Sequence, residues 1–169
     1  MVSDTVTAEL HNSSSPYALV ESKKGVLNTA GVGTFNFATV VNGTPYYIVV
    51  KHRNAIETWS SAGNSFTFGL LSYDFTSSQS QAYGSNLVLK DGKYCICSGD
   101  INHDNNVNLL DLIEVDNDNT NIVNGYINTD VNGDNNVNLL DLIIVDNNNT
   151  AIIKRVAPTG ALVSKSVKQ

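Results

Sequence analysis

Two twelve-residue stretches decide how this chain is interpreted: Asp100-Ile-Asn102-His-Asp104-Asn-Asn106-Val-Asn108-Leu-Leu-Asp111 and Asp130-Val-Asn132-Gly-Asp134-Asn-Asn136-Val-Asn138-Leu-Leu-Asp141. They begin 30 residues apart, and residues 100–120 match residues 130–150 at 17 of 21 positions. In each stretch Asp or Asn occupies positions 1, 3, 5, 9 and 12. Because the spaced pattern recurs in register, we interpret it as a duplicated structural unit.

The chemistry of these positions predicts two bound calcium ions. Side-chain oxygens at those five positions, with a backbone carbonyl at position 7, supply the oxygen-only shell that Ca²⁺ needs. We expect Asn108 and Asn138 to act mostly through a water molecule. The remaining ligands are predicted to be Asp100, Asn102, Asp104, the Asn106 carbonyl and Asp111 for one ion, and Asp130, Asn132, Asp134, the Asn136 carbonyl and Asp141 for the other.

Two positions depart from the usual EF-hand loop. Position 6 normally holds Gly because the chain turns there with positive φ, and here it holds Asn105 and Asn135. Asn tolerates that conformation better than most residues. Position 12 normally holds Glu, and here it holds Asp111 and Asp141, whose shorter side chains require the following helix to begin closer to the ion.

Each loop is followed, but not preceded, by a helical pattern. The residues before Asp100 are typical of a strand and a turn, and those before Asp130 are too few for a full helix. After each loop comes Leu-Leu-Asp-Leu-Ile-x-Val, an apolar stripe compatible with about two helical turns. Residues 98–158 therefore resemble the dockerin family, whose modules are pairs of calcium loop–helix units.

That resemblance implies a docking surface and a partner. In dockerins, loop positions 10 and 11 help to select a cohesin, and the duplication allows docking in two orientations. The matching residues are Leu109, Leu110, Leu139 and Leu140, and Ile144 stands where the first repeat has Glu114. The alternative for these leucines is packing within the small module itself, because about 60 residues need most of their apolar side chains for a core.

Residues 1–97 follow a different pattern. Short alternating or β-branched runs are separated by turn signals, which favours an antiparallel β-sandwich. This part resembles the Ig-like or prealbumin-like domains that accompany dockerins in secreted bacterial proteins. We expect Asp91-Gly92 to form a two-residue hairpin turn. The strands are predicted at 5–10, 17–22, 34–40, 46–51, 56–60, 65–71, 86–90 and 93–97.

The predicted fold is therefore β-rich with a small α module: an antiparallel β-sandwich (1–97), a dockerin-like pair of calcium loop–helix units (98–158), and a tail (159–169) that is either disordered or an edge strand. The acidic charge is local, since residues 98–158 sum to −8 while residues 1–97 are neutral. There is no basic face for nucleic acid and no apolar run long enough to span a membrane. Cys95 and Cys97, two residues apart in a predicted strand, are poorly placed to bond each other.

The expected function is a non-enzymatic, calcium-dependent interaction module of a secreted or cell-surface protein that docks to a cohesin-like partner. Scattered carboxylates in residues 1–97 do not form a recognisable catalytic set. One alternative is a self-assembling subunit of an extracellular filament or surface layer, whose partners are other copies of itself. A second is a carbohydrate-binding module with a docking tag, in which the expected exposed aromatics Tyr17, Tyr73 and Tyr83 stack on sugar rings.

Overall fold

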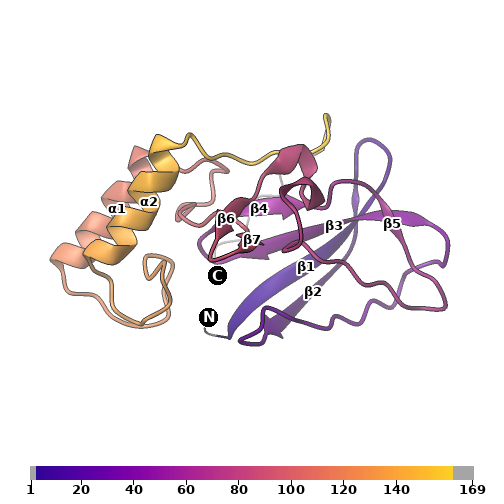
Figure 1. Cartoon of the computed structure of the whole chain (residues 1–169), viewed down its shortest axis with the longest axis horizontal. Helices are drawn as coiled ribbons and strands as arrows, with labels where there is room; N and C mark the ends of the chain where they lie inside the picture. The colour runs from indigo at the N-terminus through magenta and orange to yellow at the C-terminus, as the bar shows by residue number, and fades with distance from the viewer. Residues whose placement is uncertain (1–2, 162–169) are drawn as a thin grey trace. The chain divides into compact units, whose positions relative to one another are not determined.

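The computed structural model describes residues 3–161 of the 169-residue chain, so the predicted tail lies outside the described residues from position 162 onward. The chain is β-rich, with antiparallel sheets and two helices (Figure 1), as the sequence predicts. It divides into two compact units. The first comprises Met1–Lys51, Thr58–Cys95 and Val156–Gln169, and the second comprises His52–Glu57 and Ile96–Arg155.

The first unit is built on one main sheet. Its strand order is β2-β1-β3-β4, and β5 pairs with β3. β1 and β2 run antiparallel with Asp4 opposite Leu27. Its buried side chains Leu10, Tyr46 and Phe66 form a core of their own. The strands of this sheet are β1 (Asp4–Asn12), β2 (Leu19–Leu27), β3 (Pro45–His52), β4 (Ala55–Trp59) and β5 (Asn64–Ser65).

A separate two-stranded ribbon confirms the predicted hairpin. β6 (Val88–Lys90) pairs antiparallel with β7 (Lys93–Cys95). Asp91 and Gly92 have φ of 50° and 78°, as a two-residue turn with two left-handed positions requires. Both cysteines are free thiols. Two short 3₁₀ turns, η1 (Gln79–Gln81) and η2 (Tyr83–Ser85), precede the ribbon.

Two predicted strands are wrong. Residues 34–40 alternate like a strand but form no ladder with any described strand, because the Glu21 carboxylate accepts the backbone N–H groups of Ala38 and Thr39 instead. Residues 65–71 are broken by a tight turn in which Thr67 and Leu70 exchange both backbone hydrogen bonds, at 2.9 and 3.0 Å. Phe68 and Gly69 at the tip have positive φ.

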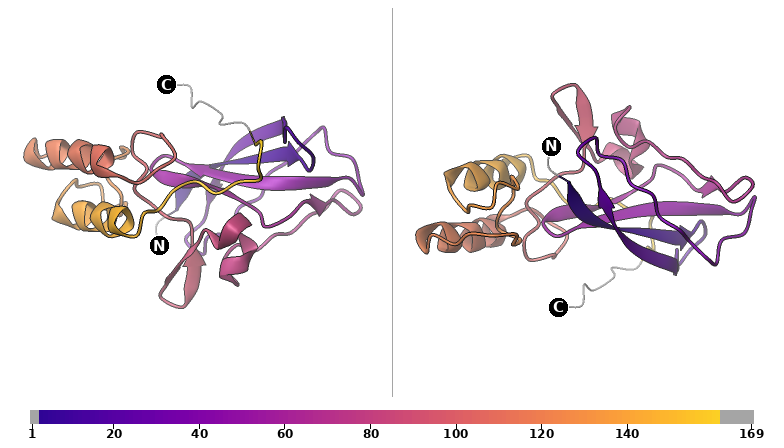
Figure 2. Two further views of the ribbon diagram at one scale, coloured as in Figure 1. Left: turned by 90° about the horizontal axis from the view of Figure 1, so that it is seen from above. Right: turned by 90° about the horizontal axis from the view of Figure 1, so that it is seen from below.

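The second unit contains helices α1 (Leu109–Thr120) and α2 (Leu139–Thr150), which lie side by side in every view (Figures 1 and 2). Each is 12 residues long, just over three turns rather than the predicted two. The polar residues after Val115 and Val145 continue the two helices, and backbone N–H groups just beyond each helix bond to its last carbonyls. There Val123 donates to the Asp118 carbonyl, and Ile153 donates to the Asn148 carbonyl.

The core of the second unit draws equally on both repeats. Val115 and Val145, one from each helix, are fully buried. Ile56 from the start of β4 is also fully buried in this cluster, so the second unit includes chain from well before residue 98. No helix among residues 3–161 is long and apolar enough to cross a membrane. The buried members of this cluster are Ile56, Ile101, Val107, Val115, Val137 and Val145.

Candidate metal centre and docking face

The last aspartate of each loop is held at the loop's centre by backbone amides. Asp111 and Asp141 are fully buried. Asp111 accepts from the N–H groups of Ile101 (2.7 Å) and Asn102 (3.2 Å) through one oxygen and of Asn108 (2.9 Å) through the other. Asp141 repeats this pattern in the second loop, at 2.8 to 3.0 Å. A carboxylate has about four lone-pair sites, so three amide contacts leave room for a cation.

The intervening residues form consecutive side-chain turns. Asn102 accepts from the Asp104 N–H and Asp104 from the Asn106 N–H, each at 2.8 Å. The same two bonds recur at 2.8 Å in the second loop. Asn105 and Asn135 have φ of 74° and 66°, which confirms the left-handed turn predicted at position 6. These turns curl each loop, so that its candidate metal-ligating oxygens lie on one short, curved segment of chain.

Asn108 and Asn138, predicted as water-mediated ligands, have a second role. Each is the N-cap of its helix and accepts a hydrogen bond from the N–H two residues on, at 2.8 Å. Asp111 and Asp141 complete the capping boxes, so one carboxylate ties together the loop's first residues and its helix start. Helix formation and loop closure are therefore coupled in both repeats.

The first loop has the electrostatic signature of a cation site. Asp100 is 2% exposed, and its Oδ1 atom has no hydrogen-bond partner among residues 3–161. Burial, followed by the charges of Asp111 and Asp104, raises the pKa of Asp100 to about 7. Clustered, buried carboxylates are costly without a counter-charge, and a divalent ion bound by the loop oxygens would supply it. The residues present therefore fit Ca²⁺.

Aspartates alone would not complete such a site. No group of three or more His, Cys, Asp or Glu side chains in the described range is arranged to hold a metal ion. Binding would therefore depend on amide and backbone oxygens, such as those of Asn102 and Asn106, as in an EF-hand-type loop. His103, at a loop position that supplies no predicted ligand, is half-buried.

The two repeats interlock. Residues of the first loop pair with the chain just after α2, through an antiparallel bridge between Asn106 and Lys154. Residues of the second loop pair in the same way with the chain after α1, through a bridge between Asn124 and Asn136. Each loop is thus braced by the other repeat, and neither is a self-contained unit.

The leucines at loop positions 10 and 11 are on the surface. Their exposed fractions lie between 57% and 64%, and Ile113 and Ile143, one turn further along each helix, are nearly half exposed. The core takes Leu112, Val115 and their repeats instead, so packing within the module does not account for the exposed set. Ile144 is half-buried. The exposed leucines are Leu109, Leu110, Leu139 and Leu140.

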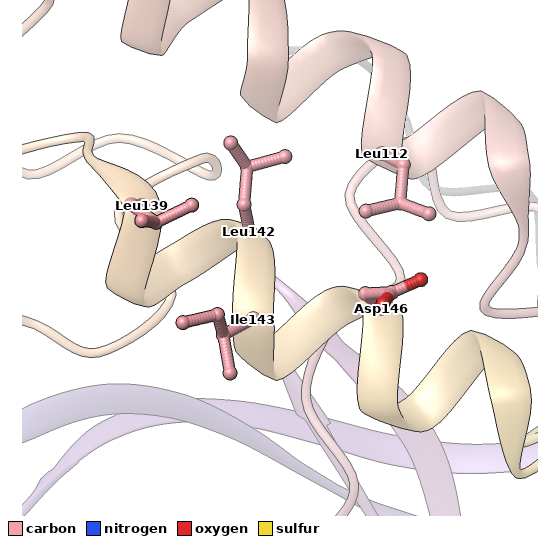
Figure 3. Close-up of a pocket in the computed structure, with 5 residues that line it drawn as sticks. All are labelled: Leu112, Leu139, Leu142, Ile143 and Asp146. Carbon is pink, nitrogen blue, oxygen red and sulfur yellow. The ribbon is translucent and has the colours of Figure 1, made fainter.

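A shallow apolar hollow opens between the helices (Figure 3). Leu112 of α1 lines it together with Leu139, Leu142 and Ile143 of α2. Asp146 places a carboxylate at its edge. The helix pair therefore offers an apolar strip with an acidic rim.

Sequence reasoning missed two side chains beside the second loop. Arg53 and Asn54 form the two-residue turn between β3 and β4, and both belong to the second unit. Arg53 donates through Nη1 to the carbonyls of Ile127 and Asp130, the latter at 2.8 Å. Asn54, 1% exposed, donates to the carbonyls of Asn128 (3.1 Å) and Asp130 (3.0 Å). No sequence motif marks this turn as a part of the calcium module.

In the first unit, the tyrosines expected to be exposed are half-buried. Tyr17 and Tyr47 pack edge-on, with centroids 5.8 Å apart, and Tyr47 packs edge-on against Tyr83 at 6.2 Å. The Tyr73 hydroxyl donates to the Gln81 carbonyl at 2.5 Å. Tyr17 and Tyr83 thus pack edge-on against Tyr47 and are not free-standing surface rings.

A buried charge cluster in the same unit was also missed. Glu9 accepts from His11 at 3.0 Å and pairs with Lys51 at 2.8 Å, and the His11 ring lies 4.7 Å from that of Trp59. Burial raises the pKa of Glu9, but the hydrogen bonds and charges of His11 and Lys51 outweigh it, so the net pKa is lowered. Every member has a partner within the cluster, which therefore acts as a structural network.

Comparison with known proteins gives no family for this chain: no family model, no curated protein and no solved structure matches it.

Proposed function

We propose that this chain is a non-enzymatic, calcium-dependent protein–protein interaction module of a secreted or cell-surface protein. In this proposal, residues 98–158 act as a dockerin-like pair of loop–helix units that binds two Ca²⁺ ions and docks to a cohesin-like partner. The β-rich first unit, proposed as a small β-sandwich, acts as its companion domain.

One observation carries the proposal: the same three apolar side chains are exposed on each of two helices, and the start of each helix is tied to a candidate calcium loop. Solvent-exposed Leu and Ile in a repeated arrangement point to a binding surface, since a monomeric protein gains nothing by exposing them. The capping aspartates, Asp111 and Asp141, connect that surface to the loops. Metal loss would therefore release the helix starts that present the leucines. The exposed side chains are Leu109, Leu110, Ile113, Leu139, Leu140 and Ile143.

The charge of the surface supports a protein partner. The module carries an excess of acids, and Asp146 lies beside the apolar hollow. A partner with an apolar patch bordered by basic residues would complement it. Calcium loading would reduce the acidic charge and so favour the approach of such a partner.

Replacing Leu110 and Leu140 together with Asp tests the proposal. Both side chains are more than half exposed, so the variant is expected to fold, to bind calcium like the unaltered chain and to lose binding to a cohesin-type domain. Asn117→Asp with Asn147→Asp adds the same two charges at exposed positions of the same helices outside the apolar hollow, and is the matched control. Loss of calcium affinity in the leucine variant would instead mean that these leucines are needed for the fold of the module.

Size-exclusion chromatography of the full chain with calcium distinguishes the second hypothesis, self-assembly. Discrete monomers that bind a cohesin-type domain support docking. Open polymers that require calcium and disappear in the leucine variant would assign the same surface to contacts between copies of this chain. If the double Asp variant folds, binds calcium and associates normally, the proposed recognition face is wrong.

A further inference from the structure

The two loops are nearly identical in sequence but lie in different electrostatic surroundings. In the first loop, the Asp100 carboxylate accepts hydrogen bonds from the backbone of Asn105 and Asp104, but its Oδ1 atom is buried without a hydrogen-bond partner among the described residues. In the second, Asp130 Oδ1 accepts from the N–H groups of Gly133 (3.0 Å) and Asp134 (3.1 Å), and Oδ2 accepts from Asn135 (3.2 Å). The first carboxylate of the second loop is therefore already satisfied without a metal.

A cation accompanies the second loop. Nη2 of Arg53 lies 3.8 Å from Asp130 Oδ2, and the two side chains are 11% and 1% exposed. The same guanidinium donates to the Asp130 carbonyl and lies over the Tyr126 ring, 4.3 Å from its centroid. Three kinds of contact thus hold one positive charge at the entrance of the second loop.

The first loop has a different neighbour at the equivalent place. Cys97 corresponds to Ile127 in the repeat, and its carbonyl accepts the backbone N–H of Ile56 at 2.9 Å, where the Ile127 carbonyl accepts Arg53. Asp100 forms no ion pair with a lysine or arginine in the described part of the chain, and its acidic neighbours are Asp111 and Asp104. Nearly equal sequences therefore carry unequal local charge.

We propose that Arg53 is a built-in counter-cation of the second loop and makes the two calcium sites unequal. The second loop depends less on the ion for its shape and binds Ca²⁺ more weakly, whereas the first loop depends more on the ion and binds it more tightly. This inference rests on the proposed calcium binding. It adds that one loop is tuned by a side chain from the β3–β4 turn.

Two effects of Arg53 oppose each other, and their sizes decide the sign. Its hydrogen bonds to the Ile127 and Asp130 carbonyls brace the loop, which favours binding. Its charge repels a divalent ion held by the Asp130 carboxylate, which disfavours binding. At the effective dielectric constant of about 20 suited to partly buried pairs, the repulsion between a unit charge and a divalent ion a few ångströms apart exceeds the combined net contribution of these two hydrogen bonds. We therefore expect the charge to dominate.

The test is a calcium titration of the ¹⁵N-labelled full chain followed by NMR. The amides of His103 and Gly133, at position 4 of the first and second loops, report each site separately. In the unaltered chain, His103 is expected to reach its bound position at lower calcium than Gly133. In Arg53→Gln, the calcium concentration at the Gly133 midpoint is expected to fall by on the order of tenfold, while that of His103 changes much less. Arg53→Lys, which keeps the charge, should resemble the unaltered chain.

A second readout excludes a merely structural role. In Arg53→Gln at saturating calcium, the Gly133 amide should exchange with solvent faster, because the bracing bonds are lost, even though the calcium affinity of the second loop rises. A purely structural arginine would produce faster exchange together with weaker affinity. Should the variant not fold without metal, the affinities are measured from the calcium-loaded state by competition with a chelator.

The possible failures are distinguishable. An unchanged or weaker second site in Arg53→Gln, or an Arg53→Lys variant that behaves like the Gln variant, overturns the role of Arg53 while leaving calcium binding intact. If neither reporter amide responds to calcium in the unaltered chain, the proposed function itself fails.

Discussion

The backbone N–H of Val107, inside the first loop, donates to the carbonyl of Ile153, just beyond the second helix, at 2.9 Å. The repeat of this bond joins Val137 to Val123 at 3.1 Å. Each loop therefore forms its last turn against the exit of the opposite helix. A disturbance of either loop is transmitted to both helices, so the second unit should fold and unfold as one.

Calcium removal should unfold the second unit and leave the first intact. Metal binding and folding are coupled when the ligands are buried carboxylates that repel one another without the ion. Calorimetry on chelator-treated protein is expected to show two bound Ca²⁺ per chain, and chelation should remove the helical circular dichroism signal. Fluorescence of Trp59, the single tryptophan, should stay unchanged because it is buried in the first unit. Fewer than two sites, or a joint loss of both signals, would contradict this.

Truncating the helix residues that face the core should be costly. Val115→Ala or Val145→Ala removes two buried methyl groups and should lower the free energy of unfolding of the second unit by about 1–3 kcal/mol. Ile113→Ala and Ile143→Ala are matched controls on the same helices, nearly half exposed, with expected changes within about 0.5 kcal/mol. Urea unfolding followed by circular dichroism in saturating calcium measures both. Equal effects at core and control positions would mean that the burial pattern is wrong.

The sequence predicts where these helices begin but not which face is buried. The stripe Leu109-Leu110-x-Leu112-Ile113-x-Val115 is apolar around most of the helix, so periodicity favours no single face. The fold selects Leu112 and Val115, because the interlocked loops determine how each helix is turned toward the core. The loop turns, by contrast, follow from local chemistry: Asn105 and Asn135 adopt the positive φ that their position in the motif requires.

Gly99→Ala should destabilise the second unit even though it adds one methyl group. Gly99 has φ of 111°, and a Cβ there would lie 3.0 Å from Val107 Cγ1 and 3.5 Å from the Val145 backbone. The backbone strain alone is of order 1–3 kcal/mol for a non-glycine residue. Gly125→Ala separates the two causes, because Gly125 has φ of 117° but open space around its Cβ position. Thermal unfolding in calcium should show a larger loss for Gly99→Ala than for Gly125→Ala; equal losses would exclude the steric cause.

Glu21→Gln should loosen residues 38 and 39 and weaken the first unit at neutral pH. Hydrogen bonds from the Ala38 backbone, from Thr39 and from Lys23 lower the pKa of Glu21 from 4.5 to about 2. Because the pKa is depressed in the folded protein, this stabilisation is complete above pH 4.5 and disappears as the pH falls toward 2. The difference in unfolding midpoint between the two proteins, followed by Trp59 fluorescence, should shrink over that range.

Lys23→Met is the control for Glu21. It removes the 2.9 Å ion pair but keeps the amide contacts, so its effect should be smaller than that of Glu21→Gln. A larger effect of Lys23→Met would assign the stabilisation to the ion pair. The same carboxylate explains why residues 34–40 are not a strand. Alternation shows which side chains are half-buried, but not that a distant glutamate takes the amides that a neighbouring strand would need.

Sequence patterns also do not predict where the boundary between the two units falls. That boundary supports a last prediction. Nothing in residues 52–57 distinguishes them from an ordinary hairpin, so the sequence places the calcium module from residue 98. In the structure, Ile56 is buried in the module's core, and Glu57 accepts from Arg155 at 2.5 Å. A segment about forty residues earlier in the sequence thus completes the core and contacts Arg155, the last residue of the second unit.

Ile56→Ala should therefore destabilise the calcium unit, although Ile56 and Trp59 stand three residues apart on one strand. The fully buried isoleucine is expected to contribute about 2–5 kcal/mol. The loss should appear as a lower urea midpoint of the helical signal and as a higher calcium concentration needed to recover it, with a smaller change in Trp59 fluorescence. Val49→Ala, equally buried on β3 but in the first unit, should show the reverse pattern. If both variants shift the two signals equally, the units do not have separate cores and the division of the chain is wrong.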